Sequence, residues 1–220
     1  MTKRAYSRLS QDRRRTDLIE ATLSCVADLG LDKAGARQIA ERAGVSAGLI
    51  RHYFSSKEDM VRSAYAYLMG QMTAAAEESG AGEALLPEVA LAEVIAANFA
   101  PPNLSGVKVS LWATFVGRVR VDPAYADIHR EGYREFLDLL EARIHPVLVA
   151  HGRPADPTRC KSLAIALNGL IDGLWIEGSL GHGLYDARRL PGLALGAAEG
   201  ILRLPDTTLT RHLAREDERS

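Results

Sequence analysis

The chain has 220 residues, of which 47% are hydrophobic and 25% charged, and this composition suits a globular fold rather than a disordered one. Two cysteines and the lack of a long apolar run argue against a disulfide framework, a signal peptide and a membrane span, and favour a cytoplasmic protein. The net charge is −1, but residues 1–15 hold six Lys and Arg residues against Asp12 alone. Basic charge gathered at one end is a hint of contact with nucleic acid.

Apolar residues with helical period predict a first helix over residues 12–29. After a short loop, the segment ARQIAERAG predicts a short helix that ends at Gly44. Ser46 is placed to cap a second short helix, AGLIRHYF. Two short helices joined by a tight glycine turn are typical of a helix-turn-helix. A longer helix over residues 57–79 follows, opened by one of the two serines before it.

The second half keeps the helical period and is divided by proline and glycine. It predicts five more helices, near residues 87–100, 105–120, 123–150, 157–180 and 186–203. No segment shows the alternating pattern and turn residues of a β-hairpin. The predicted fold is therefore all-α with about nine helices. A three-helix helix-turn-helix domain is expected over residues 1–56 and a helical ligand-binding and dimerisation domain over residues 57–220.

The segment from Ile39 to Lys57, IAERAGVSAGLIRHYFSSK, carries the functional signal. Its small apolar residues fix the angle between the two short helices and leave the face of residues 46–53 turned outward. Arg51 and His52 on that face can enter a major groove and read base edges. Four further polar residues are placed to hold phosphates: Arg37, Ser46, Tyr53 and Lys57. The alternative interpretation is a structural pair of helices with a solvated charged rim.

The run over residues 13–57, above all IAERAGVSAGLIRHYFSSKEDM, closely resembles the DNA-binding domain of TetR-family transcriptional repressors. The ending at residues 50–54 is similar to the choline-responsive BetI-type branch of that family. In the second half, residues 111–115, 122–123 and 170–175 look like the ligand-binding and dimerisation domain of the same branch. The resemblance covers most of the chain.

The resemblance implies a homodimer that binds a pseudo-palindromic DNA operator and responds to a small-molecule effector, without a cofactor or a metal. It places eight residues at the DNA: Arg37, Ser46, Ala47, Gly48, Arg51, His52, Tyr53 and Lys57. Two positions depart from the family pattern. Gly35 stands where a threonine often caps the second helix, and Arg51 replaces a common aromatic residue. An arginine at that position predicts a guanine at the matching operator step.

Two apolar stripes on the last two helices are candidates for the dimer interface. They consist of Leu163, Leu167, Leu170 and Leu174, and of Leu190, Leu193, Ala194, Ala197, Ala198 and Ile201. The alternative is that both stripes complete the core of the subunit. Because the family builds its dimer from its last two long helices, the resemblance favours the interface.

A carboxylate close to aromatic rings can hold a quaternary ammonium ion through charge and cation–π interactions. The candidate effector site consists of Trp112, Phe115, Tyr133, Asp172 and Trp175. The alternative for each residue is an ordinary place in the core. At the level of function, two alternatives to a cation-sensing repressor stay open: a regulator of the same fold that senses an apolar drug or acyl compound, and a helical interaction module that binds no DNA.

Motifs of known enzyme classes are missing from the sequence. It has no HExxH, no GxSxG, no phosphate-binding loop and no dinucleotide fingerprint, and its six histidines are scattered. Cys25 and Cys160 are too far apart in the chain for a metal-binding pair and are expected in the core. The sequence therefore predicts a transcriptional regulator and not an enzyme.

Overall fold

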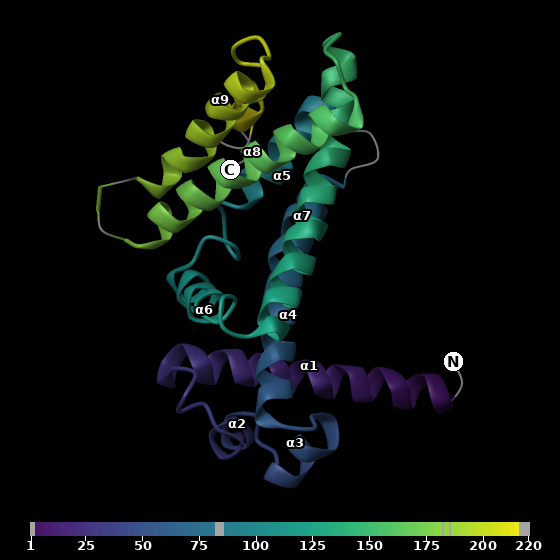
Figure 1. The fold of residues 1–220 in the computed structure, drawn as a ribbon, viewed down its shortest axis with the longest axis vertical. Helices are drawn as coiled ribbons and strands as arrows, with labels where there is room; N and C mark the ends of the chain where they lie inside the picture. The colour runs from purple at the N-terminus through teal and green to yellow at the C-terminus, as the bar shows by residue number, and fades with distance from the viewer. Residues whose placement is uncertain (1–2, 82–85, 182, 185, 216–220) are drawn as a thin grey trace. The chain divides into compact units, whose positions relative to one another are not determined.

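The computed structural model describes residues 3–81, 86–181, 183–184 and 186–215. Within these residues it contains nine α-helices, two short 3₁₀ helices and no strand, which confirms the all-α prediction (Figure 1). The helices are α1 (Lys3–Leu29), α2 (Ala36–Arg42), α3 (Ala47–Tyr53), α4 (Lys57–Ser79), α5 (Pro87–Ala97), α6 (Gly106–Val116), α7 (Pro123–Ala150), α8 (Pro157–Ser179), η1 (Ala187–Arg189), α9 (Leu190–Leu202) and η2 (Thr210–Arg215). None of the described helices is long and apolar enough to cross a membrane.

Helices α4 and α7 have the bounds that the sequence predicts, and the other helices differ at their ends. α1 begins at Lys3 instead of residue 12, because the added segment is rich in good helix formers such as Lys, Arg and Leu. α5 ends at Ala97, ahead of the proline pair at 101–102, and α6 ends at Val116, just before a glycine. The helix predicted over 186–203 is a 3₁₀ turn followed by α9.

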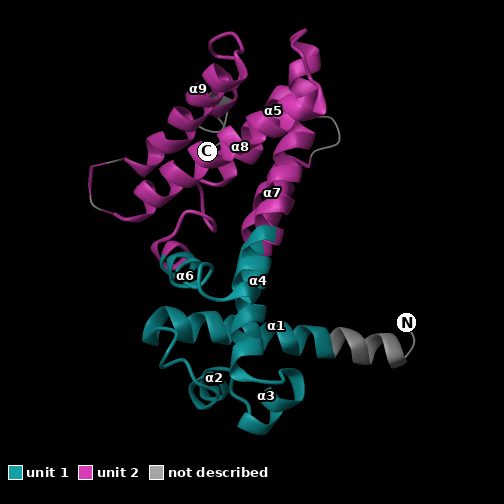
Figure 2. Cartoon of the chain, in the orientation of Figure 1, with its two compact units in different colours: residues 1–69, 110–130 teal, residues 70–109, 131–220 magenta. Residues whose placement is uncertain are grey.

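The chain packs as two compact units. Unit 1 consists of Met1–Met69 and Ser110–Arg130, and unit 2 consists of Gly70–Val109 and Glu131–Ser220 (Figure 2). The chain passes from one unit to the other within α4, within α6 and within α7. Three helices therefore contribute residues to both units.

In unit 1, a tight turn sets the angle between α2 and α3. Gly44 has a φ of 65°, in the left-handed region that glycine adopts without strain, and the N–H of Val45 donates to the carbonyl of Ala40 at 2.9 Å. Ile39 on α2 and Ile50 on α3 are both buried. The turn and these apolar contacts hold the two short helices in one fixed orientation.

A reciprocal cap begins α4, directly after α3. Ser56 Oγ accepts the N–H of Asp59 at 3.0 Å, so Ser56 and not Ser55 caps the helix. The Asp59 carboxylate accepts the N–H and the hydroxyl of Ser55 at 2.9 and 3.0 Å. The backbone hydrogen bond from Ser55 lowers the pKa of Asp59 below its ordinary value. The cap fixes the direction in which the chain leaves the helix-turn-helix.

A stack of aromatic rings joins three helices of unit 1. Tyr65 of α4 stacks on Phe115 of α6, with ring centroids 4.9 Å apart, and on Tyr125 of α7, at 5.9 Å. The Tyr65 hydroxyl lies 2.7 Å from Nδ1 of His129, also on α7. Burial lowers the pKa of His129, which favours the neutral ring, and Nδ1 of a neutral ring can accept a hydrogen bond from the Tyr65 hydroxyl. These contacts fasten α4 to the parts of α6 and α7 that belong to the same unit.

In unit 2, α9 packs against α5 and α8, and the buried acid Glu199 ties the C-terminal segment to this group. Its Oε1 accepts the N–H groups of Leu209 and Thr210 at 2.6 and 2.8 Å, and the Thr210 hydroxyl at 3.2 Å. Its Oε2 accepts the N–H of Thr207 at 3.1 Å. Four donors offset the cost of burying this carboxylate, which pairs with no cation of the described residues.

Replacing Glu199 with glutamine is expected to lower the free energy of unfolding by about 1.5–3 kcal/mol, because one acceptor oxygen becomes an amide that faces N–H donors. Urea denaturation measures the change. The exposed Glu78 of α4 provides the control: Glu78→Gln should leave stability within about 0.5 kcal/mol of the parent protein. Equal effects of the two substitutions would show that Glu199 does not hold the segment.

Candidate DNA-binding surface and effector site

Helix α3 is held at its start and open on one face. Ser46 caps it by accepting the N–H of Leu49 at 3.4 Å, and Ile50 and the C-cap residue Phe54 are buried beneath it. The opposite face carries Ala47, Gly48, Arg51 and His52, all of which are exposed. Small residues at the beginning of the helix and a cation beyond them give a surface that can approach a groove closely and reach its base edges.

The structure places the eight residues expected at the DNA on α2, α3 and the start of α4. Six of them are exposed: Arg37, Ser46, Ala47, Gly48, Arg51 and His52. Tyr53 and Lys57 are half-buried, and the Tyr53 ring meets the His52 ring edge to face, with centroids 5.3 Å apart. Gly35 is the N-cap residue of α2 and makes no side-chain cap bond. The hydrogen bond that a threonine would supply there is absent.

Lys57 has a second role that its place in the motif did not indicate. Its Nζ donates to the backbone carbonyls of Leu31 and Asp32 at 3.2 and 3.1 Å. Lys57 therefore anchors the loop between α1 and α2, and one N–H of its ammonium is left for a phosphate. The partners are backbone oxygens some 25 residues earlier in the chain, so no sequence pattern identifies them.

Two arginines that sequence reasoning did not single out also hold the helix-turn-helix. Arg42 of α2 donates to Ser24 and Asp28 of α1 at 2.6 and 2.5 Å. Arg15 of α1 lies over the Phe54 ring, 5.1 Å from its centroid, and donates to Ser63 at 3.0 Å. Both arginines connect α1 to the helices around the reading face.

In unit 2, Asp172 of α8 is a half-buried carboxylate held by neutral groups. Its Oδ2 accepts the hydroxyl of Tyr133 on α7 at 2.8 Å and the amide of Asn168, one turn earlier on α8, at 3.1 Å. Burial raises the pKa of Asp172, and the two hydrogen bonds oppose that rise. No cation of the described residues lies within ion-pair distance of this carboxylate.

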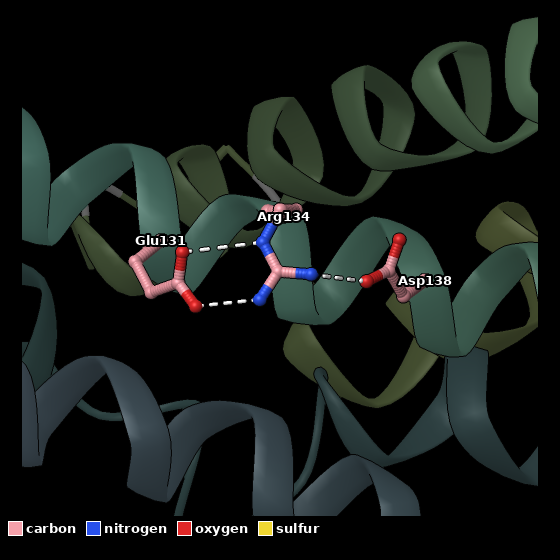
Figure 3. Close-up of polar contacts among 3 residues, drawn as sticks. All are labelled: Glu131, Arg134 and Asp138. Carbon is pink, nitrogen blue, oxygen red and sulfur yellow. Dashed lines mark hydrogen bonds and ion pairs between the residues drawn. The ribbon is translucent and has the colours of Figure 1, made fainter.

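Arg134, which follows Tyr133 in the sequence, forms its ion pairs with residues other than Asp172. Figure 3 shows Arg134 between Glu131 and Asp138 on the exposed side of α7, with bonds of 2.5 and 3.1 Å to Glu131 and 2.8 Å to Asp138. Because both ends of the guanidinium are occupied, Arg134 does not supply the positive charge that Asp172 lacks.

The five residues expected in the effector site divide between the units. Tyr133 and Asp172 are in direct contact in unit 2, and Trp175 lies one turn further along α8, with its indole N–H donating to the carbonyl of Asn103 at 3.0 Å. Trp112 and Phe115 belong to unit 1, where Phe115 is fully buried in the aromatic stack. The structure thus brings Tyr133 and Asp172 into contact and places Trp175 on the adjacent turn of α8; Asn168 also bonds Asp172, and Asn103 bonds Trp175.

The two apolar stripes proposed for the dimer interface face partly into the subunit. Leu167, Leu190, Ala194 and Ala198 are completely buried, so for them the alternative of a subunit core holds. Leu193 and Ala197 are exposed. The exposed stripes of α8 and α9 are made instead of small residues with a few aliphatic ones: Ile165, Ala166, Gly169 and Gly173, and Leu193, Gly196, Ala197 and Gly200. Such residues let a partner helix approach closely.

Comparisons with known proteins agree with this arrangement. A family model described as "BetI-type transcriptional repressor, C-terminal" matches residues 87–203, and one described as "Bacterial regulatory proteins, tetR family" matches residues 18–64. The HTH-type transcriptional regulator BetI of Burkholderia cenocepacia is 30% identical over 82% of this chain and 90% of that protein.

Two solved structures share the fold. A transcriptional regulator from Pseudomonas aeruginosa PAO1 is 28% identical, with a TM-score of 0.78 over 90% of this chain and 94% of that one. A transcriptional regulator from Saccharomonospora viridis, solved in complex with choline, is 19% identical, with a TM-score of 0.69 over 83% of this chain and 94% of that one. The second likeness concerns the fold alone.

Replacing Asp172 with asparagine is expected to stabilise the protein at neutral pH when no ligand is present. The folded state raises the pKa of this carboxyl, so the folded protein binds the proton more tightly than the unfolded chain and loses stability as the pH rises between the two pKa values. Melting temperatures of both proteins, measured from acidic to neutral pH, test this. The advantage of Asp172→Asn should vanish below the ordinary pKa of aspartate; an offset that is independent of pH would contradict it.

Proposed function

We propose that this protein is a homodimeric repressor whose operator binding is controlled by a small organic cation. The chain belongs to the BetI-type branch of the tetR family of transcriptional regulators. The single observation that carries the cation is the half-buried Asp172 carboxylate, which has two neutral donors and, within the described part of the chain, no positive partner. An effector with a positive charge offsets the desolvation of this group, whereas an apolar effector leaves it in place.

The exposed face of α3 supports the operator-binding half of the proposal. Arg51 can bind O6 and N7 of a guanine with both guanidinium nitrogens, and His52 lies beside it. Ser46 and Tyr53 lie at the two ends of α3 and Lys57 begins α4, so their hydroxyl and ammonium groups are placed to bind phosphates and set the register. Ala47 and Gly48 keep the first turn narrow enough to enter the groove.

The exposed stripes of α8 and α9 support the dimer. One helix-turn-helix contacts too few base pairs for tight binding, whereas two copies related by a two-fold axis read both halves of a pseudo-palindrome. A second copy would cover Ile165 and Leu193, which are 54% and 49% exposed in the single chain. The open glycines of α8, Gly169 and Gly173, leave room for its helices.

Control by the effector follows from the connection of the units. α4, α6 and α7 each pass from unit 2 into unit 1, where the Tyr65 stack fastens them together. A ligand that binds one arrangement of these helices more tightly than another shifts the population of arrangements, and with it the fit of the dimer to the operator.

Replacing Arg51 with alanine should relax the base preference at one position of each half-site by about 1–3 kcal/mol and leave the other positions unchanged. Salt-titrated gel shifts with the DNA upstream of its own gene and with single-base variants measure this. The exposed Arg153 of unit 2 supplies the control, since Arg153→Ala removes the same charge away from α3. A uniform loss of affinity across all sequences would show that Arg51 does not read a base in the groove. The absence of any gel shift at low salt would show that the protein is not a repressor of this operator.

Replacing Ile165 with glutamate should convert the dimer to a monomer and weaken operator binding at least tenfold, because it buries charges at the proposed interface. Sedimentation velocity gives the oligomeric state. Val149 of α7 is similarly exposed, at 58% against 54% for Ile165, so Val149→Glu is the matched control and should remain dimeric. A dimeric Ile165→Glu protein would place the interface elsewhere.

A further inference from the structure

A second uncompensated charge lies in unit 2. Lys108, at the start of α6, is half-buried, and its Nζ donates to Oδ1 of Asn103 at 3.0 Å. Burial lowers the pKa of this ammonium, and no carboxylate of the described residues lies within ion-pair distance of it. Like Asp172, Lys108 is a charge taken partly out of water and held by a neutral group only.

Asn103 connects this lysine to the cluster around Asp172. The Asn103 side chain is buried and donates to the carbonyl of Met72 on α4 at 3.1 Å, which fixes the orientation of its amide toward Lys108. The Asn103 carbonyl accepts the indole N–H of Trp175 at 3.0 Å. Trp175 follows Asp172 by three residues on α8, so the two side chains point from adjacent turns of one helix.

The two opposite charges are connected through Asn103 and Trp175, by two hydrogen bonds and then by adjacent turns of α8, and they do not form an ion pair with each other. Asp172 takes its hydrogen bonds from Tyr133 and Asn168, and Lys108 gives its own to Asn103. A direct ion pair would lower the cost of burying both, yet the structure keeps them apart. A ligand that carries one charge alone can satisfy only one of them.

We infer that the effector is a zwitterion, whose quaternary or primary ammonium group binds at Asp172 and whose carboxylate or other anionic group binds at Lys108. The inference rests on the proposed function, since it takes the cation site at Asp172 as given. A zwitterion offsets the desolvation of both groups and brings no net charge into the unit. Its anionic end would also act on α6 two residues before that helix enters unit 1 at Ser110.

Isothermal titration calorimetry of the full-length dimer with matched probes tests the inference. The probes are choline, a series of trimethylammonio-alkanoates (acetate, butanoate and hexanoate) that varies the distance between the charges, and the carbon isostere of each, in which a tert-butyl group replaces trimethylammonium. At least one member of the zwitterion series should bind about tenfold or more tightly than choline, because it adds a charge-assisted hydrogen bond. Its carbon isostere should bind more weakly than the zwitterion itself.

Two variants assign the ends of the ligand. Lys108→Gln keeps an N–H for Asn103 and removes the charge; it should lower the affinity of the best zwitterion about tenfold and leave that of choline within twofold. Lys108→Met serves the same purpose if the glutamine variant is unstable. Lys161→Gln, at an exposed lysine of α8, is the control and should change neither affinity. Asp172→Asn should lower the affinity for both choline and the best zwitterion.

The outcomes separate this inference from the proposed function. The inference of a zwitterionic effector is wrong if choline binds at least as tightly as every zwitterion, or if neither Lys108 variant lowers the affinity for any zwitterion. A cation site that depends on Asp172 would stand in either case. If no probe with an ammonium group binds, or if Asp172→Asn changes no affinity, the cation site itself is wrong and the zwitterion falls with it.

Discussion

A carboxylate that leaves water without meeting a cation costs free energy, and Asp172, in the middle of α8, meets no cation among the residues that the structure describes. Its position depends on α7 and α8 packing closely enough for the Tyr133 hydroxyl to reach it at 2.8 Å. The contrast with Glu199 shows what the site lacks. Glu199 is more deeply buried but accepts four hydrogen bonds from the backbone and side chains of one segment, and so completes a structural element. Asp172 has two neutral donors and no cation within ion-pair distance among the described residues, and this contrast supports the proposal that it binds a positively charged ligand.

The proposed coupling between this group and the DNA-binding surface depends on α4, α6 and α7, which each contribute residues to both units. The reading helix α3 is only seven residues long and has little stability of its own. Its orientation comes from the turn at Gly44, from Ile39 and Ile50 beneath it, and from the cap at Ser56 that begins α4. α4 is in turn fastened to α6 and α7 by the stack around Tyr65. Within unit 1, the orientation of α3 therefore depends on how α4, α6 and α7 pack together.

Sequence patterns predicted local features well and contacts between distant segments poorly. The family resemblance is confirmed, and α4 and α7 have their predicted bounds because serine, proline and glycine mark where the helices begin and end. The helical period of the sequence predicted the apolar stripes of α8 and α9. It could not distinguish residues that face the core, such as Leu167, from exposed residues, such as Ile165. Asn103 has no periodic signal at all, and the bonds of Lys57 go to backbone carbonyls. Both depend on packing that a single sequence does not encode locally.

The central claim is that cation binding in unit 2 and operator binding by unit 1 are coupled, and reciprocity makes this directly measurable. Binding of choline can be followed by calorimetry with the free dimer and with the dimer saturated by its operator at the same salt concentration. A repressor released by its effector must bind choline more tightly when free, by at least about fivefold for a coupling of ordinary size, and must lose operator affinity by the same factor when choline is saturating. Equal affinity of choline for the free and the operator-bound protein would contradict the account.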